Sequence, residues 1–514
     1  MEVISRHPRQ LSIVTTCTLL VLILSLVFAL FSRGPTRAAG EELTQISSDP
    51  YTNNSSFHKT EVEPDTFAFG NTVVSTFQVS RFYDGGAANI GWATSTNAGE
   101  TWTHGFLPGI TVFAGGPYNR ASDPSVAYDA RHKAWIISYL AIVTGGHPVG
   151  PIHTDLLASR SPDGLHWSTP VIISLGGPST FYDKNWSVCD DWTSSPFYGH
   201  CYTEWDNAGA NNLVLMSTSK DGGKTWGPPK TNANHASVIG GQPVVQPNGN
   251  VVVPIIQFKQ HFTIAILASF RSTDGGASWS STVKIADFIT FFEPSFIRNP
   301  DLPSAEVDAS GRVYVAWYDC RFEPGCNAND IVISTSTDGL SWTAPKRVPI
   351  DPIGSGIDHF TPGIGVDRST SSDNAHIGLT YYYYPNPNCS TNTCILDVGF
   401  ISSTNGGDSW SASEQLAGPM KLTWLALTTQ GYMYGDYIST SIVPGDDDAT
   451  PVFMVAQQPT GGPRCSLQDG VICHEAAYTT PEDLLQMVGG SNTAGNASAA
   501  QSSSQKVHVT QTGF

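Results

Sequence analysis

Short apolar runs separated by polar turns recur along most of the chain, in groups of four. One group consists of segments 122–129, 134–140, 156–160 and 167–173, which are five to eight residues long. Runs of this length, bounded by Gly, Pro, Asn and Asp, are typical of β-strands. The pattern therefore predicts an all-β protein built from repeated four-stranded antiparallel units.

Six segments share one turn motif at the end of the third strand of a unit. They cover residues 95–102, 161–167, 219–226, 272–279, 336–342 and 403–410. Their first residues are 66, 58, 53, 64 and 67 positions apart, about the length of one propeller blade. Asp or Asn caps backbone N–H groups of the turn, Gly supplies a positive φ, and the final Trp opens the next strand. The motif thus predicts hairpin turns in a β-propeller.

Polar residues mark the expected beginnings of the inner strands. They are Glu63, Asp123, Asp183, Gln242, Glu306, His359 and Asp436. Seven beginnings predict seven blades, with six as the alternative. The last unit, residues 432–479, shows only three strands and no turn motif. Residues 42–47 are expected to supply its fourth strand and close the ring, which removes an exposed sheet edge.

The six motifs resemble the Asp box, or bacterial neuraminidase repeat, of the sialidase-like superfamily, whose pattern is SxDxGxxW. The second and fifth copies are one residue shorter than this pattern. The resemblance covers about residues 62–479 and implies a propeller, while the box itself implies no reaction. In sialidases that carry these boxes, three arginines bind the substrate carboxylate, a Tyr assisted by Glu is the nucleophile, and an Asp is the acid/base. Membership would imply exo-α-sialidase activity, although the FRIP motif of that family is absent from this sequence.

The N-terminus has the composition of an export element. Arg6 and Arg9 precede an apolar run over residues 11–31, long enough either for a signal anchor or, with cleavage after it, for a signal peptide. We expect three regions: residues 1–40 for export or anchoring, 41–480 for the propeller, and 481–514 for a short helix and a disordered Ser/Ala/Gly-rich tail. The expected location is extracellular or at the cell surface, with membrane contact through the N-terminal segment only.

The cysteines support an oxidising compartment. Eight of the nine fall into close pairs, which predicts the disulfides Cys189–Cys201, Cys320–Cys326, Cys389–Cys394 and Cys465–Cys473. No pair has the spacing of a zinc site. The formal charge of −18 argues against nucleic acid or an anionic membrane as the main partner.

In an up-and-down sheet, the inner strands begin on the face opposite the motif turns. Polar and mostly acidic residues should therefore converge there, and crowded carboxylates raise one another's pKa, as a general acid requires. The candidate catalytic residues are Asp123 as acid, Tyr437 as nucleophile, and Glu306 or Glu63 as its base. The candidate substrate-binding residues are Arg81, Arg321, Arg464, Asp183, Lys184, His359 and Asp436.

Each candidate also has a structural interpretation. A buried carboxylate at a propeller axis often accepts N–H groups of the next blade, and the alternative role of each arginine is an ion pair with a neighbouring acid, as for Arg321 with Asp319. The sequence therefore leaves two functions open: a hydrolytic, cofactor-free, sialidase-like glycosidase, or a non-catalytic surface propeller that binds glycan or protein. The binding alternative would use aromatic stretches such as Tyr381–Tyr384. Ca²⁺ is the one ion that the axial carboxylates would suit, and we expect a monomer.

Overall fold

The computed structural model describes residues 43–145, 151–178, 180–259, 264–445 and 448–481. All of them belong to one compact unit that starts at Glu41. The helices in this part are four short 3₁₀ turns, η1 (Val112–Ala114), η2 (Ala208–Ala210), η3 (Ser372–Asn374) and η4 (Leu422–Trp424). Within these ranges, no helix has the length and apolarity to cross a membrane. The predicted export segment, and the predicted C-terminal helix and tail from residue 482 on, lie outside the described residues.

β-Strands make up the rest of the regular structure. The first half of the chain contains β1 (Thr44–Gln45), β2 (Glu61–Phe69), β3 (Thr72–Arg81), β4 (Ala87–Ser95), β5 (Thr103–Phe106), β6 (Arg120–Asp129), β7 (Ala134–Thr144), β8 (Pro151–Ser161), β9 (Val171–Ser174), β10 (Tyr182–Cys189), β11 (Cys201–Asn207), β12 (Leu213–Ser219), β13 (Val238–Ile239), β14 (Val244–Val245) and β15 (Val251–Lys259). The second half contains β16 (Ile264–Ser272), β17 (Val283–Asp287), β18 (Ser304–Val307), β19 (Val313–Asp319), β20 (Asp330–Ser336), β21 (Lys346–Arg347), β22 (Asp358–Val366), β23 (Ile377–Tyr384), β24 (Ile395–Ser403), β25 (Glu414–Lys421), β26 (Ala426–Thr428), β27 (Gly431–Met433), β28 (Ser439–Ile442), β29 (Ala449–Thr460) and β30 (Ile472–Thr479).

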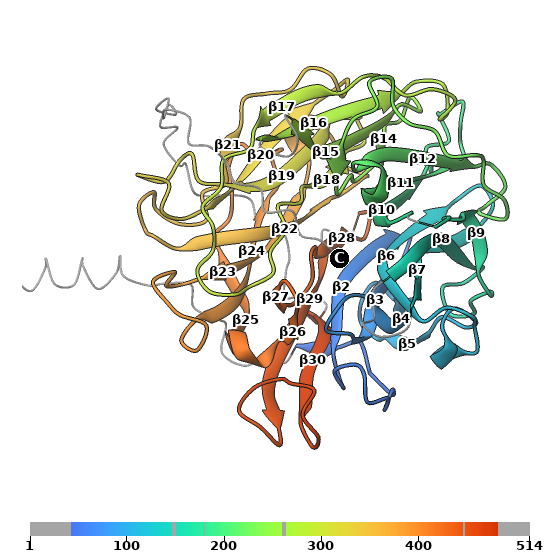
Figure 1. Cartoon of the computed structure of the whole chain (residues 1–514). Coiled ribbons are helices and arrows are strands. Elements are labelled where there is room, and N and C mark those ends of the chain that lie inside the picture. Colours follow the sequence, from blue (N-terminus) through green and yellow to red (C-terminus); the bar gives the residue numbers. More distant parts are fainter. Residues whose placement is uncertain (1–42, 146–150, 179, 260–263, 446–447, 482–514) are drawn as a thin grey trace, which may run out of the picture. The chain divides into compact units, whose positions relative to one another are not determined.

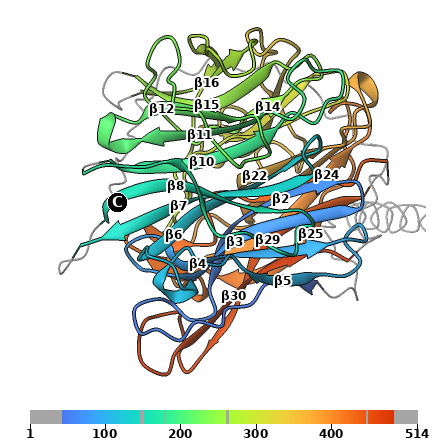
Figure 2. The same cartoon turned by 90° about the vertical axis from the view of Figure 1, so that its right-hand side faces the viewer.

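The strands form antiparallel meanders arranged around a central axis, as Figure 1 shows. The inner strands in chain order are β2, β6, β10, β14, β18, β22 and β28. Each contacts the next, and β28 contacts β2, so the ring is closed. In the view turned by 90°, strands of neighbouring meanders run side by side in roughly one direction (Figure 2). The prediction of an all-β propeller with antiparallel strands is confirmed.

The number of sheets differs from the prediction. In the described part of the chain, five sheets have four or more strands, instead of seven blades or the alternative six. The first two predicted blades, β2–β5 and β6–β9, merge into one 8-stranded sheet because Ala87 of β4 pairs with Ala121 of β6. The third, β10–β12, has three regular strands, since the chain after its motif turn pairs with β12 only through isolated bridges.

The N-terminal strand closes the last sheet, as the sequence predicts. Thr44 and Gln45 of β1 pair antiparallel with Thr479 and Tyr478 of β30, in the sheet ordered β1-β30-β29-β28. The Ile46 N–H donates to the Ala477 carbonyl at 2.9 Å and extends this pairing by one residue. The ring is therefore fastened by segments from both ends of the described chain.

The six turn motifs have one hydrogen-bond pattern. In every copy the first Ser hydroxyl oxygen accepts the N–H of a Gly in the turn at 2.8–3.0 Å. The Asp or Asn side chain accepts the N–H of the residue before the Trp at 2.8–3.1 Å. Gly276 has φ +79°, and a Cβ there would lie 2.3 Å from Thr218 Oγ1 in the preceding meander. Glycine thus lets the turn pack closely against its neighbour.

The turn motifs define two faces of the ring. Since successive strands alternate in direction, the six motif turns share one face, here called the box face, with the loops that follow the inner strands. The inner strands begin on the opposite face, here called the non-box face. The loops between the second and third strands also lie on the non-box face, and three of the disulfides are in such loops.

All four predicted disulfides are confirmed. They join Cys189 to Cys201, Cys320 to Cys326, Cys389 to Cys394, and Cys465 to Cys473. Each closes a short loop between adjacent strands. Four disulfides in one domain are typical of proteins that fold in an oxidising compartment.

A substitution in one motif tests the role of its Ser. We expect Ser272→Ala to lower the free energy of unfolding by about 1 kcal/mol, because Gly276 loses its hydrogen-bond acceptor in a buried turn. The measurement is urea unfolding followed by tryptophan fluorescence, with the exposed Ser281→Ala as control. Equal stability of the two variants would contradict a structural role for the motif Ser.

Candidate functional site

Three inner strands place unusual backbone at the point where they reach the axis. Glu63 in β2, Asp123 in β6 and Lys184 in β10 have positive φ values of 57°, 49° and 51°. At each of these positions the register with the second strand shifts, so the strand bulges. A side chain in the left-handed region costs roughly 1–2 kcal/mol. β22 has the same bulge at Thr361, with φ 47°. The surrounding structure therefore maintains this strain at equivalent places in the ring, and the side chains of Glu63, Asp123 and Lys184 meet.

Lys184 is the centre of this meeting point. Its Nζ donates to Asp436, and it lies 3.6 Å from Glu63 Oε1 and 3.7 Å from Asp123 Oδ2. All four side chains are 5% exposed or less. Removing such charges from water is unfavourable unless each is paired, and here one ammonium group serves three carboxyl groups. We call Glu63, Asp123, Lys184 and Asp436 the axial cluster.

Two arginines border the axial cluster. Arg298 donates from Nε to Asp436 Oδ1 at 2.6 Å and from Nη2 to the other oxygen of the same carboxylate. Arg81 is buried and donates to Gln78 Oε1 at 3.0 Å, while Gln78 donates to Glu63. Sequence reasoning missed Arg298, because it lies within the long connection between β17 and β18, where no periodicity indicates its position.

The carboxyl groups of the cluster differ in protonation. Burial raises the pKa of Glu63 well above its ordinary value, and Asp123 raises it further against the opposing effect of Lys184. Burial also acts to raise the pKa of Asp123, but Lys184 and hydrogen bonds from Glu63 and Ser122 outweigh it and bring that pKa below its ordinary value. Asp436 has a strongly lowered pKa because Arg298 and Lys184 overcome the effect of burial. Proton binding in the cluster is therefore favoured at Glu63 and disfavoured at Asp123 and Asp436.

A second group of acids lies behind the cluster in β10 and β11. Asp183 is directly opposite Asp206, and Glu204 is two residues away on the same face of β11. Burial raises the pKa of Asp183 to about 7 and those of Glu204 and Asp206 well above their ordinary values. Lys184 and Arg298 act to lower the pKa of Asp183, and Lys184 acts to lower that of Asp206, but burial outweighs these effects, so the neutral form of these carboxyl groups is favoured.

Several axial polar groups have the structural role that the sequence left open. Asp65 Oδ2 accepts the Val126 N–H at 2.8 Å, and Gln242 Oε1 accepts the Ala305 N–H at 2.9 Å. Asp123 Oδ2 likewise lies 3.2 Å from the Lys184 N–H. In each case, an inner strand binds the next inner strand of the ring. Asp123 is therefore part of the fold as well as of the axial cluster.

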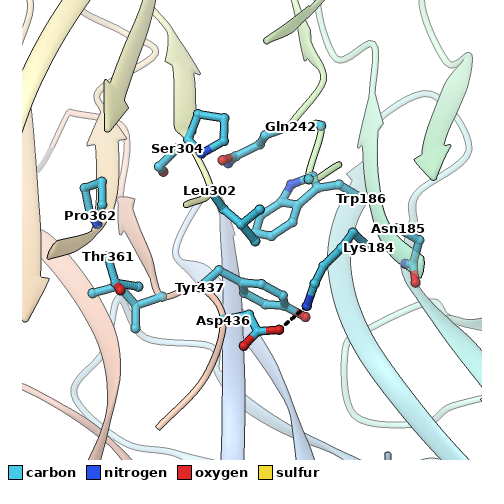
Figure 3. Close-up of a pocket in the computed structure, with 14 residues that line it drawn as sticks. Lys184, Asn185, Trp186, Gln242, Leu302, Ser304, Thr361, Pro362, Asp436 and Tyr437 are labelled. Atoms are coloured by element: carbon cyan, nitrogen blue, oxygen red, sulfur yellow. Dashed lines mark hydrogen bonds and ion pairs between the residues drawn. The ribbon is translucent and has the colours of Figure 1, made fainter. Parts of the chain in front are cut away.

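A pocket opens beside the axial cluster on the non-box face (Figure 3). It is a small pocket that is partly open to solvent. Its wall includes Lys184, Asp436, Tyr437, Trp186 and Thr361. Glu63 and Asp123 are not among the lining residues and approach the wall through Lys184, at 3.6 Å and 3.7 Å from its Nζ. Trp186 meets Tyr437 edge to face with ring centroids 5.1 Å apart. Two aromatic rings and an ion pair therefore face the same space.

Tyr437 is in this pocket but is not activated as the sequence predicted. Its hydroxyl donates to the Pro124 carbonyl at 3.0 Å. Burial raises the pKa of Tyr437 well above its ordinary value, and the carboxylates nearby raise it further. Glu306, one of the two expected bases, instead lines a second pocket with Arg368, deeper toward the box face. Glu63 is thus the expected base that lies near Tyr437.

The three predicted arginines do not converge. Arg81 reaches the axial cluster, but Arg321 pairs with Asp319, with 2.8 Å between Nε and Oδ1. Arg464 is exposed in the loop between β29 and β30. The structural interpretation of Arg321 as an ion-pair partner is therefore the one that the structure bears out.

His359 lies away from the pocket wall. It is 1% exposed, stacks on Tyr383 with centroids 5.9 Å apart, and burial lowers its pKa to about 4. Ligand atoms of His359, Asp330 and Asp351 come within 4.8 Å of one another. Arg347 pairs with both carboxylates, at 2.7 Å and 2.5 Å, and already supplies the positive charge there. The group is therefore an ion-pair network with a neutral imidazole.

The four consecutive tyrosines are core residues. Tyr381, Tyr382, Tyr383 and Tyr384 in β23 are at most 6% exposed. The expectation that they offer an aromatic recognition surface is wrong, because both faces of β23 are covered by neighbouring sheets.

Loss of the central cation tests the energetics of the axial cluster. We expect Lys184→Met to lower the free energy of unfolding by about 3–5 kcal/mol, because the carboxylates would remain buried without their partner. Lys284→Met is the control, since its pair with Asp287 is 50% and 64% exposed and should contribute less than about 1 kcal/mol. Chemical denaturation at pH 7 measures both values, and equal losses would contradict the central role of Lys184.

The second acid group predicts a pH dependence. Glu204 has a raised pKa in the folded state, so its contribution to stability is complete below its unfolded pKa of about 4.3 and declines as pH rises toward the folded value. We expect Glu204→Gln to be as stable as the wild type at pH 4 and more stable at pH 8, by about 1.4 kcal/mol for each unit of the shift. Urea unfolding across pH measures this, with the exposed Glu100→Gln as control; a pH-independent difference would contradict it.

Comparisons with known proteins agree with this architecture. Residues 138–366 match the family model described as a BNR repeat-like domain. No curated protein sequence matches the chain. Solved structures with a similar arrangement include the Hadza microbial sialidase Hz136 (18% identity, 63% of each chain covered, TM-score 0.42). They also include a polysaccharide lyase of family PL25, an ulvan lyase (12% identity, 86% of this chain and 96% of that chain, TM-score 0.48).

A further similar structure is the intramolecular trans-sialidase from Ruminococcus gnavus (13% identity, 88% of this chain and 99% of that chain, TM-score 0.40). At these identities and TM-scores, none of the structures assigns an activity to this chain. The matched domain and the six Asp boxes carry the similarity of the propeller to the Asp-box (BNR repeat), sialidase-like superfamily.

Proposed function

We propose that the protein is an extracytoplasmic, glycan-active hydrolase of the exo-α-sialidase type, with its site in the pocket on the non-box face. The observation that carries the proposal is the combination in one pocket of paired aromatic rings, Trp186 and Tyr437, with a charged wall, Lys184 and Asp436. Sugar sites typically combine aromatic surfaces with a few fixed polar groups.

The charge balance of the pocket favours an anionic sugar. Three cations, Lys184, Arg298 and Arg81, lie in or beside the axial cluster, and burial disfavours the charged form of Glu63, which favours an excess of positive charge. The neighbouring Asp183, with a pKa of about 7, reduces this excess only in part near neutral pH. A net positive site in a strongly acidic protein concentrates anionic ligands locally.

Proton transfer in the proposed reaction uses the Glu63–Asp123 pair. One carboxyl group that carries a proton beside one that is ionised is the arrangement that acid/base chemistry requires. Tyr437 and Asp436 are the wall residues proposed to contact the substrate, while the pair approaches the wall through Lys184. The raised pKa of Glu63 and the lowered pKa of Asp123 support the proposal that Glu63, in place of Asp123, is the acid.

The four disulfides support an extracytoplasmic site of action. We propose accordingly that residues 1–40 export the chain, as an anchor or a cleaved signal, and that the propeller works outside the cytoplasm.

One observation favours the second candidate, a non-catalytic glycan-binding propeller. Lys184 and Arg298 both already pair with Asp436, so neither is free to bind a substrate carboxylate without rearrangement. A binding site tolerates such pairing better than a catalytic one, because it needs contacts to the ligand but no mobile proton.

Hydrolysis of fluorogenic glycosides, α-sialosides included, tests the proposal. We expect sialic acid release by the wild type and a loss of about 100-fold or more in kcat/KM for Tyr437→Phe. Tyr83→Phe is the matched control, because Tyr83 is 42% exposed and lies in another loop of the non-box face. Circular dichroism confirms that each variant is folded.

The outcomes separate the two candidates. Turnover that both tyrosine variants retain would remove Tyr437 from the site. Folded protein without turnover on any glycoside would exclude the hydrolase, and glycan-array binding by the same protein would then support the binding propeller.

A further inference from the structure

The segment that connects β17 to β18 carries two exposed aromatic rings at the border of the pocket. Phe292 is 60% exposed and Phe296 is 49% exposed, while the same segment contributes Leu302 and Pro303 to the pocket wall. We propose that the pocket takes the terminal sugar of an oligosaccharide whose following sugars stack on Phe292 and Phe296. This inference rests on the proposed function and specifies its substrate class: a glycan chain rather than a single glycoside.

The backbone beside Phe292 is fixed by hydrogen bonds to the side chain of Asn329. Phe291 donates its N–H to Asn329 Oδ1 at 2.7 Å and accepts from Asn329 Nδ2 at 2.8 Å. Asn329 is fully buried and also bonds to Asp358 Oδ1 at 2.9 Å. The exposure of Phe292 is therefore imposed by a fixed backbone, and its ring cannot turn inward by a simple loop movement.

The backbone beside Phe296 is held as firmly. The Phe296 carbonyl accepts the Tyr432 N–H, and the Arg298 N–H donates to the Tyr432 carbonyl, both at 2.8 Å. Gly431 has φ +130°, and a Cβ at this position would lie 2.8 Å from Arg298 N and from Phe296 O. Only glycine permits this close approach, so the sequence of β27 is adapted to hold the segment in place.

The segment continues directly into the pocket. Two residues after Phe296, Arg298 binds Asp436 in the pocket wall, and Asn299 accepts from the Thr361 hydroxyl at 2.5 Å. The Cα atom of Phe296 is thus within about 7 Å, the span of two residues, of the Cα atom of Arg298, whose side chain binds Asp436. The two exposed rings therefore belong to the same segment as the wall residues Leu302 and Pro303.

Two exposed phenylalanines on a fixed backbone do not stabilise the fold by burial. Their rings do offer flat apolar surfaces. The C–H face of a pyranose ring packs on such a surface while the hydroxyl groups at the edge of the sugar remain hydrated. Phenylalanine has no polar group of its own, so the pair adds affinity along a sugar chain while the pocket supplies the specificity.

The test compares substrates of two lengths. The probes are 4-methylumbelliferyl α-N-acetylneuraminide, which has one sugar, and a sialylated tetrasaccharide. We expect the double variant Phe292→Ala/Phe296→Ala to raise KM for the tetrasaccharide about fivefold to tenfold, the effect of losing one to two aromatic contacts. For the single-sugar probe, KM should stay within a factor of two. Phe69→Ala is the matched control, because Phe69 is 38% exposed at the end of β2 on the box face.

Each outcome either supports or overturns the inference. Equal KM changes for both probes, or no change for the tetrasaccharide, would overturn the inference and leave the proposed hydrolase intact. If the wild type cleaves neither probe, the hydrolase proposal fails, and the aromatic border is judged by binding of the tetrasaccharide measured calorimetrically. Affinity that falls in the double variant but not in Phe69→Ala would support it, and unchanged or absent binding would overturn it.

Discussion

The burial of Lys184 among three carboxyl groups is the interaction on which the centre of the propeller depends. Strands that converge on a narrow axis leave room there for few side chains, and water cannot solvate each of them. The chain meets this constraint with one ammonium group, one carboxyl group of raised pKa at Glu63 and two of lowered pKa at Asp123 and Asp436. The left-handed backbone at Glu63, Asp123 and Lys184 is the conformational cost of bringing these groups together.

The parts of the structure that follow from local chemistry could be predicted from the sequence. The Asp boxes form their turns through contacts within eight residues, and the cysteine pairs lie in single loops, so spacing was sufficient for both. The convergence of Asp123, Lys184 and Asp436 followed from strand order. The division into sheets did not, because it depends on pairing between units, such as that of Ala87 with Ala121. Arg298 and Glu204 were missed for the same reason, since packing alone determines their surroundings.

The axial groups serve the fold and the proposed chemistry with the same atoms. Asp123 accepts the Lys184 N–H and so connects β6 to β10. It is also the member of the Glu63–Asp123 pair whose pKa is lowered. This double role means that loss of activity in an Asp123 variant would not by itself identify a catalytic group. Tyr437 is more informative, because its phenol ring lines the pocket and its substitution by Phe keeps the ring and removes only the hydroxyl with its hydrogen bond to the Pro124 carbonyl.

These constraints imply different roles for the axial cluster and for the segment between β17 and β18. The axial cluster is coupled to neighbouring inner strands, so a change in any of its members disturbs the ring. The segment between β17 and β18 is attached through backbone contacts to Asn329 and Tyr432, and its side chains at Phe292 and Phe296 are free of that coupling. Substitution there alters the surface that a ligand meets at little cost to the fold. Preference for one glycan over another is therefore more readily determined at this border than at the axis.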